Sequence, residues 1–197
     1  MKVSKEQNAQ NRDALVAAAS GLFQEQGFAA TGVAQISERA GLTQGGFYGH
    51  FKSKNLLIEA ACRQSLQKCH DDWQAMRSTA ANGLHAVIDT YVSSEHVDTI
   101  AEGCPMAAYT CEMKTQDDAV KHTFTQGFEG MAALLQDMLP EAFADDTARR
   151  KALFFMCSMM GSLAMARAIK STDPQLAEEI VAATRENLKS AANPPGA

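Results

Sequence analysis

The run from Thr43 to Lys54 carries polar side chains of the kind that bind nucleic acid. Gln44 has an amide that can both donate to and accept from the edge of an adenine base. Tyr48 follows Phe47, whose ring suits a buried position, so the Tyr48 side chain must point elsewhere on the same helix. With the ammonium group of Lys54 nearby in the sequence, these residue types favour contact with DNA over a merely solvated surface.

Charge is divided unevenly along the chain, in favour of the same segment. The 197 residues include 18 Lys and Arg against 23 Asp and Glu, which gives a net charge of −5. Residues 1–55 hold six basic and four acidic residues, a net +2, whereas residues 56–197 hold twelve and nineteen, a net −7. Only the N-terminal segment is suited to binding a polyanion.

Five cysteines raise the question of thiol or metal chemistry. They form no Cys-x-x-Cys and no Cys/His cluster of zinc spacing, so we expect neither a metal site nor a structural disulfide. Cys62 and Cys69, like Cys104 and Cys111, are seven residues apart, which on one helix is about 10 Å and beyond disulfide reach. Cys104 is the candidate sensor thiol, because it precedes Pro105 at an expected helix start whose amides would stabilise a thiolate. An inert, buried cysteine is the alternative.

Motifs of the common enzyme classes are absent from the sequence. The chain lacks a Gly-x-Ser-x-Gly elbow, a His-Glu-x-x-His pair, a phosphate loop and a dinucleotide fingerprint. We therefore expect no catalysis and no cofactor. A catalytic pair that only folding brings together, or a helical binding protein that never touches DNA, stays open as an alternative.

The elements that must position these residues are predicted to be helices throughout. No run of alternating Val, Ile and Thr between the five prolines is long enough for a strand. Residues 8–26 carry apolar side chains at helical spacing and end at Gly27. A short helix over 33–40 is followed by Gly41, where a tight turn needs a positive φ, and Thr43 can cap a third helix. This succession is the helix-turn-helix layout.

Six more helices are expected beyond this motif. Ser53 can cap a long fourth helix to about Ser78, and later breaks delimit helices over about 83–97, 106–115, 118–138, 146–170 and 174–191. The predicted fold class is all-α, with about nine helices. We divide the chain into a helix-turn-helix domain over 1–55, a larger helical domain over 56–192 and a disordered tail over 193–197.

Neither a membrane span nor a secretory signal is expected. The longest nearly apolar run, 152–169, is interrupted by Ser158, Ser162 and Arg167 and falls short of the roughly 20 apolar residues that a span requires. The first residues are polar and lack an apolar core followed by a small-residue cleavage site. The sequence therefore predicts a cytoplasmic protein.

The segment from Arg12 to Ala61 resembles the DNA-binding domain of the TetR/AcrR family of repressors. The resemblance is carried above all by Gly41-Leu-Thr-Gln-Gly-Gly-Phe-Tyr-Gly-His-Phe-Lys-Ser-Lys54, and Ala19-x-x-Leu-Phe-x-x-x-Gly-Phe28 and Val33-x-x-Ile-x-x-x-Ala-Gly41 agree with it. This match covers roughly a quarter of the chain. Farther on, Gly103-Cys-Pro-Met-Ala-Ala108 is similar to a segment of many members, and the remainder agrees in length and helix content.

The resemblance implies a role for each polar residue around the third helix. Those that would face base edges are Gln44, Gly45 and Gly46. Those that would hold phosphates are Tyr48, His50 and Lys54, with Thr31 and Thr43 adding contacts from helix starts.

Two departures from the family pattern bear on how DNA would be recognised. Gly32 stands where the family often has Ser or Thr, which removes a hydroxyl that could bind phosphate. Gly45, Gly46 and Gly49 weaken the third helix by about 1 kcal/mol each relative to alanine. We therefore expect sparse direct readout of bases and a larger contribution from the shape of the operator.

The last two long helices favour a homodimer. The helix over 146–170 is apolar on most of its circumference, and such a helix must be covered on both sides. One side can face the domain's own core and the other the same two helices of a second copy, in a four-helix, two-fold interface. A purely intramolecular core is the alternative. The residues assigned to the interface are Met160, Leu163, Ala164, Leu176, Ile180, Ala183, Asn187 and Leu188.

Large apolar side chains of the middle helices are the candidates for an effector pocket. Methionine adapts to irregular shapes, so a small and partly apolar ligand is expected, although each residue also suits a plain core role. The candidates are Trp73, Met106, Tyr109, Phe124, Phe128, Met131, Phe155 and Met159.

The resemblance, together with these patterns, implies a repressor that binds a palindromic operator in double-stranded DNA as a homodimer, with recognition helices reaching major grooves roughly 34–36 Å apart. The resemblance implies that an effector in the larger domain shifts the long fourth helix and so changes the separation of the recognition helices. A cysteine-based redox or electrophile sensor of the same fold is the alternative.

Overall fold

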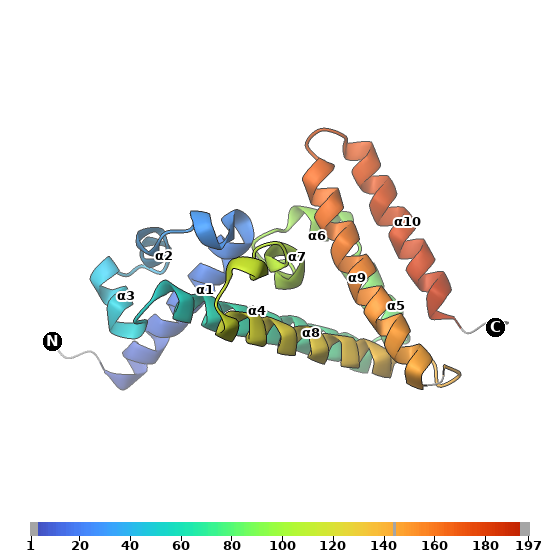
Figure 1. The fold of residues 1–197 in the computed structure, drawn as a ribbon, viewed down its shortest axis with the longest axis horizontal. Helices are drawn as coiled ribbons and strands as arrows, with labels where there is room; N and C mark the ends of the chain where they lie inside the picture. Colours follow the sequence, from blue (N-terminus) through green and yellow to red (C-terminus); the bar gives the residue numbers. More distant parts are fainter. Residues whose placement is uncertain (1–3, 144, 194–197) are drawn as a thin grey trace. The chain divides into compact units, whose positions relative to one another are not determined.

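The computed structural model describes residues 4–143 and 145–193, and regular structure in these ranges is helical (Figure 1). The predicted all-α fold is confirmed. The predicted tail lies outside the described residues from position 194 onward. The helices are α1 (Lys5–Ala30), α2 (Val33–Arg39), α3 (Gln44–His50), α4 (Lys54–Thr79), α5 (Gly83–Tyr91), α6 (Ser94–Asp98), α7 (Pro105–Tyr109), the 3-10 helix η1 (Met113–Thr115), α8 (Asp118–Met138), α9 (Asp145–Ile169) and α10 (Pro174–Ala192).

Two segments that were predicted as single helices are each divided in two. Between α5 and α6, Val92 leaves helical geometry, and the Ser93 hydroxyl accepts a hydrogen bond from the His96 amide at 3.1 Å. A serine in this position offers the backbone an alternative to continuing the helix. The predicted helix over 106–115 likewise becomes α7 and η1. The described residues therefore form ten α-helices rather than nine.

The chain divides into two compact units, which are described separately. Unit 1 comprises the described part of Met1–Gln67 together with Ile100–Thr125. Unit 2 comprises Lys68–Thr99 together with the described part of Gln126–Ala197. Helices α7 and η1 and the beginnings of α4 and α8 thus belong with the helix-turn-helix, whereas the sequence suggested a division at residues 55 and 56.

Unit 1 is built on α1, which packs against α2 and α7, while α2 packs against α3 (Figure 1). Phe23, Ile36 and Phe47 are fully buried in this unit, as their helical spacing predicts. Gly41 has a φ of 69°, which confirms the predicted left-handed turn between α2 and α3. The Thr43 hydroxyl accepts from the Gly46 amide at 3.2 Å, so the predicted cap of α3 is also confirmed.

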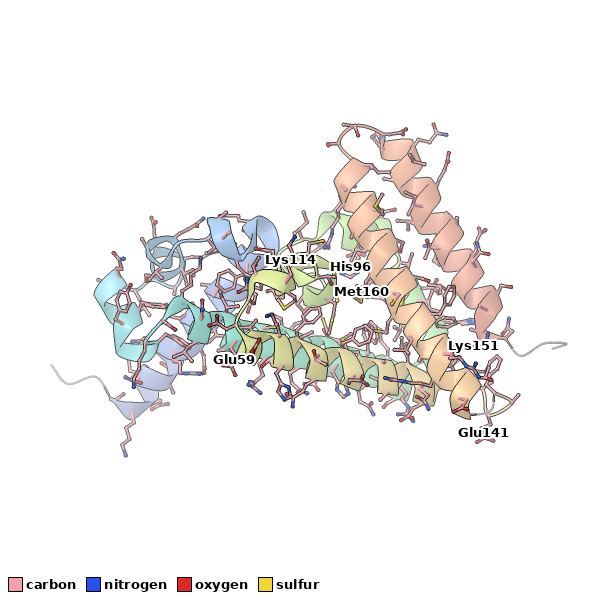
Figure 2. All side chains as sticks on the ribbon, viewed as in Figure 1. Glu59, His96, Lys114, Glu141, Lys151 and Met160 are labelled. Carbon is pink, nitrogen blue, oxygen red and sulfur yellow. The ribbon has the colours of Figure 1, made fainter. Side chains whose placement is uncertain are left out.

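In unit 2, α9 and α10 run side by side along most of their lengths, with α5 against α10 and α6 against α9 (Figure 1). Near the start of α9, the Lys151 ammonium donates to the Ala191 carbonyl at 2.7 Å and lies 4.5 Å from the centre of the Phe143 ring (Figure 2). Near its end, Arg167 donates to the carbonyl of His96 at 2.7 Å. Polar contacts therefore fasten both ends of α9.

Candidate nucleic-acid interface

Helix α3 buries one aromatic ring and presents the next to solvent. Phe47 is 0% exposed, whereas Tyr48 is 59% exposed. The two rings meet edge to face with their centres 5.1 Å apart, so the buried ring steadies the exposed one. The Tyr48 hydroxyl is thereby held on the outer face of α3, where it can donate to a phosphate.

The remaining predicted contacts on α3 form the surface around Tyr48. Gln44 and Gly45 are exposed, and Gly46 and His50 are half-buried. A Cβ added at Gly45 would meet only the Thr43 hydroxyl, at 3.9 Å, and the backbone there needs no glycine. Neither packing nor backbone geometry within the chain therefore accounts for this glycine, which leaves room for another molecule to approach closely.

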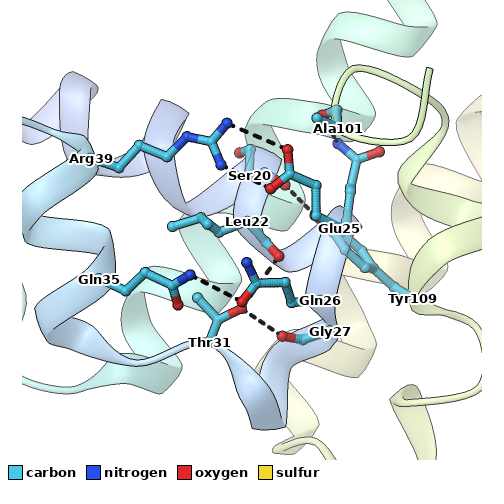
Figure 3. Close-up of polar contacts among 11 residues, drawn as sticks. Ser20, Leu22, Glu25, Gln26, Gly27, Thr31, Gln35, Arg39, Ala101 and Tyr109 are labelled. Atoms are coloured by element: carbon cyan, nitrogen blue, oxygen red, sulfur yellow. Dashed lines mark hydrogen bonds and ion pairs between the residues drawn. The ribbon is translucent and has the colours of Figure 1, made fainter.

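Thr31 corrects a predicted contact. Its side chain is fully buried, and its hydroxyl donates to the carbonyls of Gly27 at 2.8 Å and Leu22 at 3.3 Å (Figure 3). These carbonyls lie near the break in α1, so Thr31 caps the end of that helix from within the protein. The Thr31 hydroxyl is therefore not available to a DNA phosphate in this structure.

Lys54 is turned toward the protein as well. Its ammonium group donates to the Phe28 carbonyl. Burial lowers the pKa of Lys54, and the nearby carboxylate of Glu112 opposes that shift. A phosphate contact from Lys54 would require its ammonium to exchange the Phe28 carbonyl for DNA.

Lys52 is an exposed cation that the sequence pattern did not single out. It precedes Ser53, whose hydroxyl accepts from the Leu56 amide at 3.3 Å and caps α4, as predicted. On the other side of Lys52, the ring of Phe51 is covered by the Arg12 guanidinium, 5.0 Å from its centre. Lys52 therefore extends from a short connection that is fixed at both ends. The positive charge of residues 1–55 was the only sequence signal for it.

The predicted effector residues are spread over both units. Met106, Tyr109 and Phe124 belong to unit 1, where the Tyr109 ring lies 4.6 Å from that of Phe28. The others belong to unit 2, where Trp73 packs edge to face against Tyr91. Of the eight, only Phe124 and Phe128 are half-buried, and the rest are buried. The residues in unit 2 are Trp73, Phe128, Met131, Phe155 and Met159.

The predicted dimer residues divide into buried and exposed sets. Leu163 and Leu188 are 2% and 1% exposed, so they belong to the core of their own chain, which corrects their assignment. Met160, which Figure 2 labels on α9, and Ile180 are half-buried. The exposed members are Ala164, Leu176, Ala183 and Asn187.

Two large apolar side chains of α9 were missed because the whole circumference of that helix is apolar. Phe154 and Met165 are each 55% exposed, and Gly161 lies on the same exposed side. The most apolar stretch of α9 has a mean hydropathy of 1.6, and the helix over 146–169 passes a test for membrane spans by length and composition alone, a test that the core helix of a soluble protein also passes. A soluble helix that a second copy covers has the same composition.

The structure also corrects the assignment of Cys104 as a sensor thiol. It is 2% exposed, which withdraws the thiol from solvent oxidants and electrophiles. Cys62 is buried too, and that burial raises its pKa to about 12. Cys111 and Cys157 are the exposed thiols. The described residues contain no cluster of metal-binding side chains.

Two family models of transcriptional regulators match this chain. Residues 15–61 match the family model described as bacterial regulatory proteins, tetR family. Residues 80–178, half of the chain, match the model of the LmrA/YxaF-like transcriptional regulator C-terminal domain.

Individual relatives agree with these family models. The HTH-type transcriptional repressor KstR2 of Mycolicibacterium smegmatis is 28% identical over 148 residues, covering 73% of this chain and 70% of its own. The HTH-type transcriptional regulator LmrA of Bacillus subtilis is 23% identical over 172 residues, covering 84% of this chain and 91% of its own. A crystal structure of a TetR-family regulator from Agrobacterium tumefaciens superposes with a TM-score of 0.76 at 20% identity, covering 91% of this chain and 98% of that structure's chain.

Proposed function

The chain belongs to the TetR family of bacterial transcriptional regulators, and we propose that it represses transcription by binding a palindromic operator as a homodimer. A small, partly apolar effector releases it from DNA. The relatives named above are themselves described as a repressor and a regulator. As a soluble DNA-binding protein, it acts in the cytoplasm and has no catalytic function or cofactor.

The observation that carries this proposal is the outer face of α3. Tyr48 is exposed beside a fully buried Phe47, and Gln44 and Gly45 lie open on the same short helix. A helix of this kind can enter the major groove, with its polar side chains on base edges and phosphates. Thr43, Gly46 and His50 complete the proposed surface, and Lys52 adds a phosphate contact at its edge.

The proposed dimer rests on the uncovered side of α9 and α10. Phe154, Gly161 and Met165 on α9 and Leu176 on α10 are exposed to solvent in a single chain. Exposed large apolar side chains that gather on one side of a helix mark an interaction site. A second copy would cover the face by a two-fold, four-helix contact and bring two α3 helices onto successive half-sites.

The proposed effector binds among the large apolar residues of unit 2. Met131, Phe155 and Met159 line the interior of unit 2 and offer adaptable, apolar contacts. An effector releases DNA only to the extent that it prefers the conformation that cannot bind DNA. In this proposal, effector binding shifts α4, which contributes residues to both units, and this shift changes the separation of the two α3 helices in the dimer.

Selection of bound DNA from a random library tests the proposal directly. Purified wild-type protein and the Tyr48→Ala variant are compared under the same salt conditions. A palindromic site enriched by the wild type and lost by the variant supports a dimeric, sequence-specific regulator that reads DNA through α3. Equal, weak recovery by both proteins contradicts it.

A further inference from the structure

A carboxylate from the segment that follows α7 holds the end of α1, the first helix of the DNA-binding domain. The backbone amide of Phe28 donates to both oxygens of Glu112, at 2.9 and 3.1 Å, across 84 residues of sequence. The carbonyl of the same residue accepts from the Lys54 ammonium. Both polar groups of the Phe28 backbone are therefore held by side chains of opposite charge.

This arrangement exists because α1 breaks at Gly27. The φ of 82° and ψ of 168° at Gly27 are far from helical, and the last turn of α1 is set off from the rest. A break of this kind leaves backbone groups that need partners from outside the helix. The Thr31 hydroxyl donates to the Leu22 and Gly27 carbonyls (Figure 3). The Glu112 carboxylate accepts from the Phe28 amide.

The position of this last turn determines where α2 begins. Gly32, four residues after Phe28, is the N-cap residue of α2. Farther along, Arg39 of α2 pairs with Glu25 of α1 at 2.9 Å, and Gln35 donates to Gln26 at 3.1 Å (Figure 3). Helix α2 in turn packs against α3. Helices α1, α2 and α3 therefore form one connected set, which the last turn of α1 joins by leading directly into α2.

The segment that supplies Glu112 is docked along α1 at further points. The Tyr109 hydroxyl donates to the Ser20 carbonyl at 3.4 Å, and the Gln24 amide donates to the Ala101 carbonyl at 3.1 Å (Figure 3). Along the chain, Ile100–Thr125 is continuous with unit 2 at both of its ends. A rearrangement in unit 2 can therefore reach Glu112 through two covalent connections.

We propose that Glu112 is a positioning residue for DNA binding, whose carboxylate lets the α7–η1 segment set the position of α2 and α3 through the Phe28 amide. The inference rests on the proposed repressor function. It assigns to one side chain the link between the regulatory part of the sequence and the recognition helix. Glu112 itself touches no DNA.

The test compares Glu112→Ala and Glu112→Gln with a matched control, Glu102→Gln. Glu102 is an exposed carboxylate of the same segment, and its substitution also removes one negative charge. Operator affinity, affinity for random DNA and amide hydrogen exchange are measured on the full-length protein, well below its melting temperature. The exchange measurement needs no operator, so it reports on the contact even if the proposed function is wrong.

In Glu112→Ala we expect the amides of residues 28–30 to exchange at least about tenfold faster, because a charged acceptor is lost. Amides in the core of unit 2, such as that of Val87, should keep their wild-type rates, which global destabilisation would not allow. The ratio of operator to random-DNA affinity should fall at least about tenfold. Glu112→Gln, which retains one acceptor oxygen, should lie between, and Glu102→Gln should match the wild type.

Two results would overturn the inference. Unchanged exchange at residues 28–30 in Glu112→Ala would mean that the carboxylate does not hold the Phe28 amide. Faster exchange with an unchanged affinity ratio would reduce Glu112 to a local structural contact. Failure of the wild-type protein to select any operator would instead contradict the proposed function, and this outcome is recognised before the variants are compared.

Discussion

A Cβ atom at Gly27 would lie 2.7 Å from the Oε1 atom of Glu112, closer than atoms of this kind approach in proteins. Gly27 also has a φ of 82°, where side-chain-bearing residues are strained. The backbone at the break of α1 therefore requires glycine, and a larger residue there would also displace the Glu112 carboxylate. The two residues define the junction at which the α7–η1 segment meets the DNA-binding helices.

Replacing Gly27 with alanine should destabilise the protein by about 1–3 kcal/mol from the backbone alone, because this region of φ and ψ is accessible essentially to glycine only. Displacement of the Glu112 carboxylate should add to the loss. Gly21→Ala is the matched control in the same helix, since a Cβ there makes ordinary contact with Ala101 at 3.9 Å. Alanine inside a helix should stabilise by roughly 0.5–1 kcal/mol. Chemical denaturation of both variants measures the difference, and equal stabilities would contradict the strain at Gly27.

Local signals were sufficient to predict the helix-turn-helix. Gly41 and Thr43 each act on their immediate neighbours, so their types alone indicate the turn and the cap. Glu112 was not predicted, because its partner Phe28 is 84 residues away and no spacing pattern connects them. Gly27 was read as the end of a helix, whereas the chain resumes helical structure after it.

The faces of α9 were harder to assign than its existence. Apolar residues surround the helix, so periodicity could not distinguish the side that faces the chain's own core from the side that is left open. Leu163 was therefore placed at the interface although it is buried, and Phe154 and Met165 were overlooked although they are exposed. Only tertiary packing, of α9 against α10 and α6, separates the two sides.

Substituting Gly161 tests the proposed dimer. Gly161 is exposed, and a Cβ there meets nothing within 4 Å in a single chain, so Gly161→Leu should not disturb the fold of the protomer. In a closely packed two-fold contact the larger side chain should weaken dimerisation at least about tenfold, which is roughly 1.4 kcal/mol. Ala119→Leu, on the exposed start of α8, is the control. Sedimentation across a range of concentrations measures the effect, and an unchanged dimer in Gly161→Leu would place the interface elsewhere.

Removing only the hydroxyl of Tyr48 should separate the phosphate contact from the packing of its ring. Tyr48→Phe keeps the contact with Phe47, whose ring centre is 5.1 Å away, so the helix should remain folded. Two lost hydrogen bonds to charged phosphates, one from each protomer, should lower operator affinity by at least about a hundredfold. Titration of the selected operator, with circular dichroism as the check on folding, measures the change. Wild-type affinity in Tyr48→Phe would exclude the hydroxyl from the interface.

Thiol reactivity should distinguish the exposed from the buried cysteines and so test the alternative of a cysteine sensor. The pKa of Cys62 is raised to about 12, so between its ordinary value of 9.0 and about 12 the folded protein retains a proton that an unfolded chain would release. At pH 8 a maleimide should therefore modify Cys111 but leave Cys62 and Cys104 intact. Peptide mass spectrometry of native and denatured protein measures this pattern. Rapid native labelling of Cys104 would restore the sensor hypothesis.

The salt dependence of DNA binding can identify Lys52 as a phosphate contact. Each phosphate neutralised on B-DNA contributes about 0.9 to the slope of log affinity against log salt concentration, so Lys52→Gln should reduce the slope by about 1.8 in a dimer. The loss should appear on operator and random DNA alike, because phosphate contacts carry no sequence information. Lys114→Gln removes the same charge from the exposed η1 segment and should leave the slope unchanged. Equal slopes for Lys52→Gln and Lys114→Gln would mean that Lys52 contributes only to the overall charge of the protein.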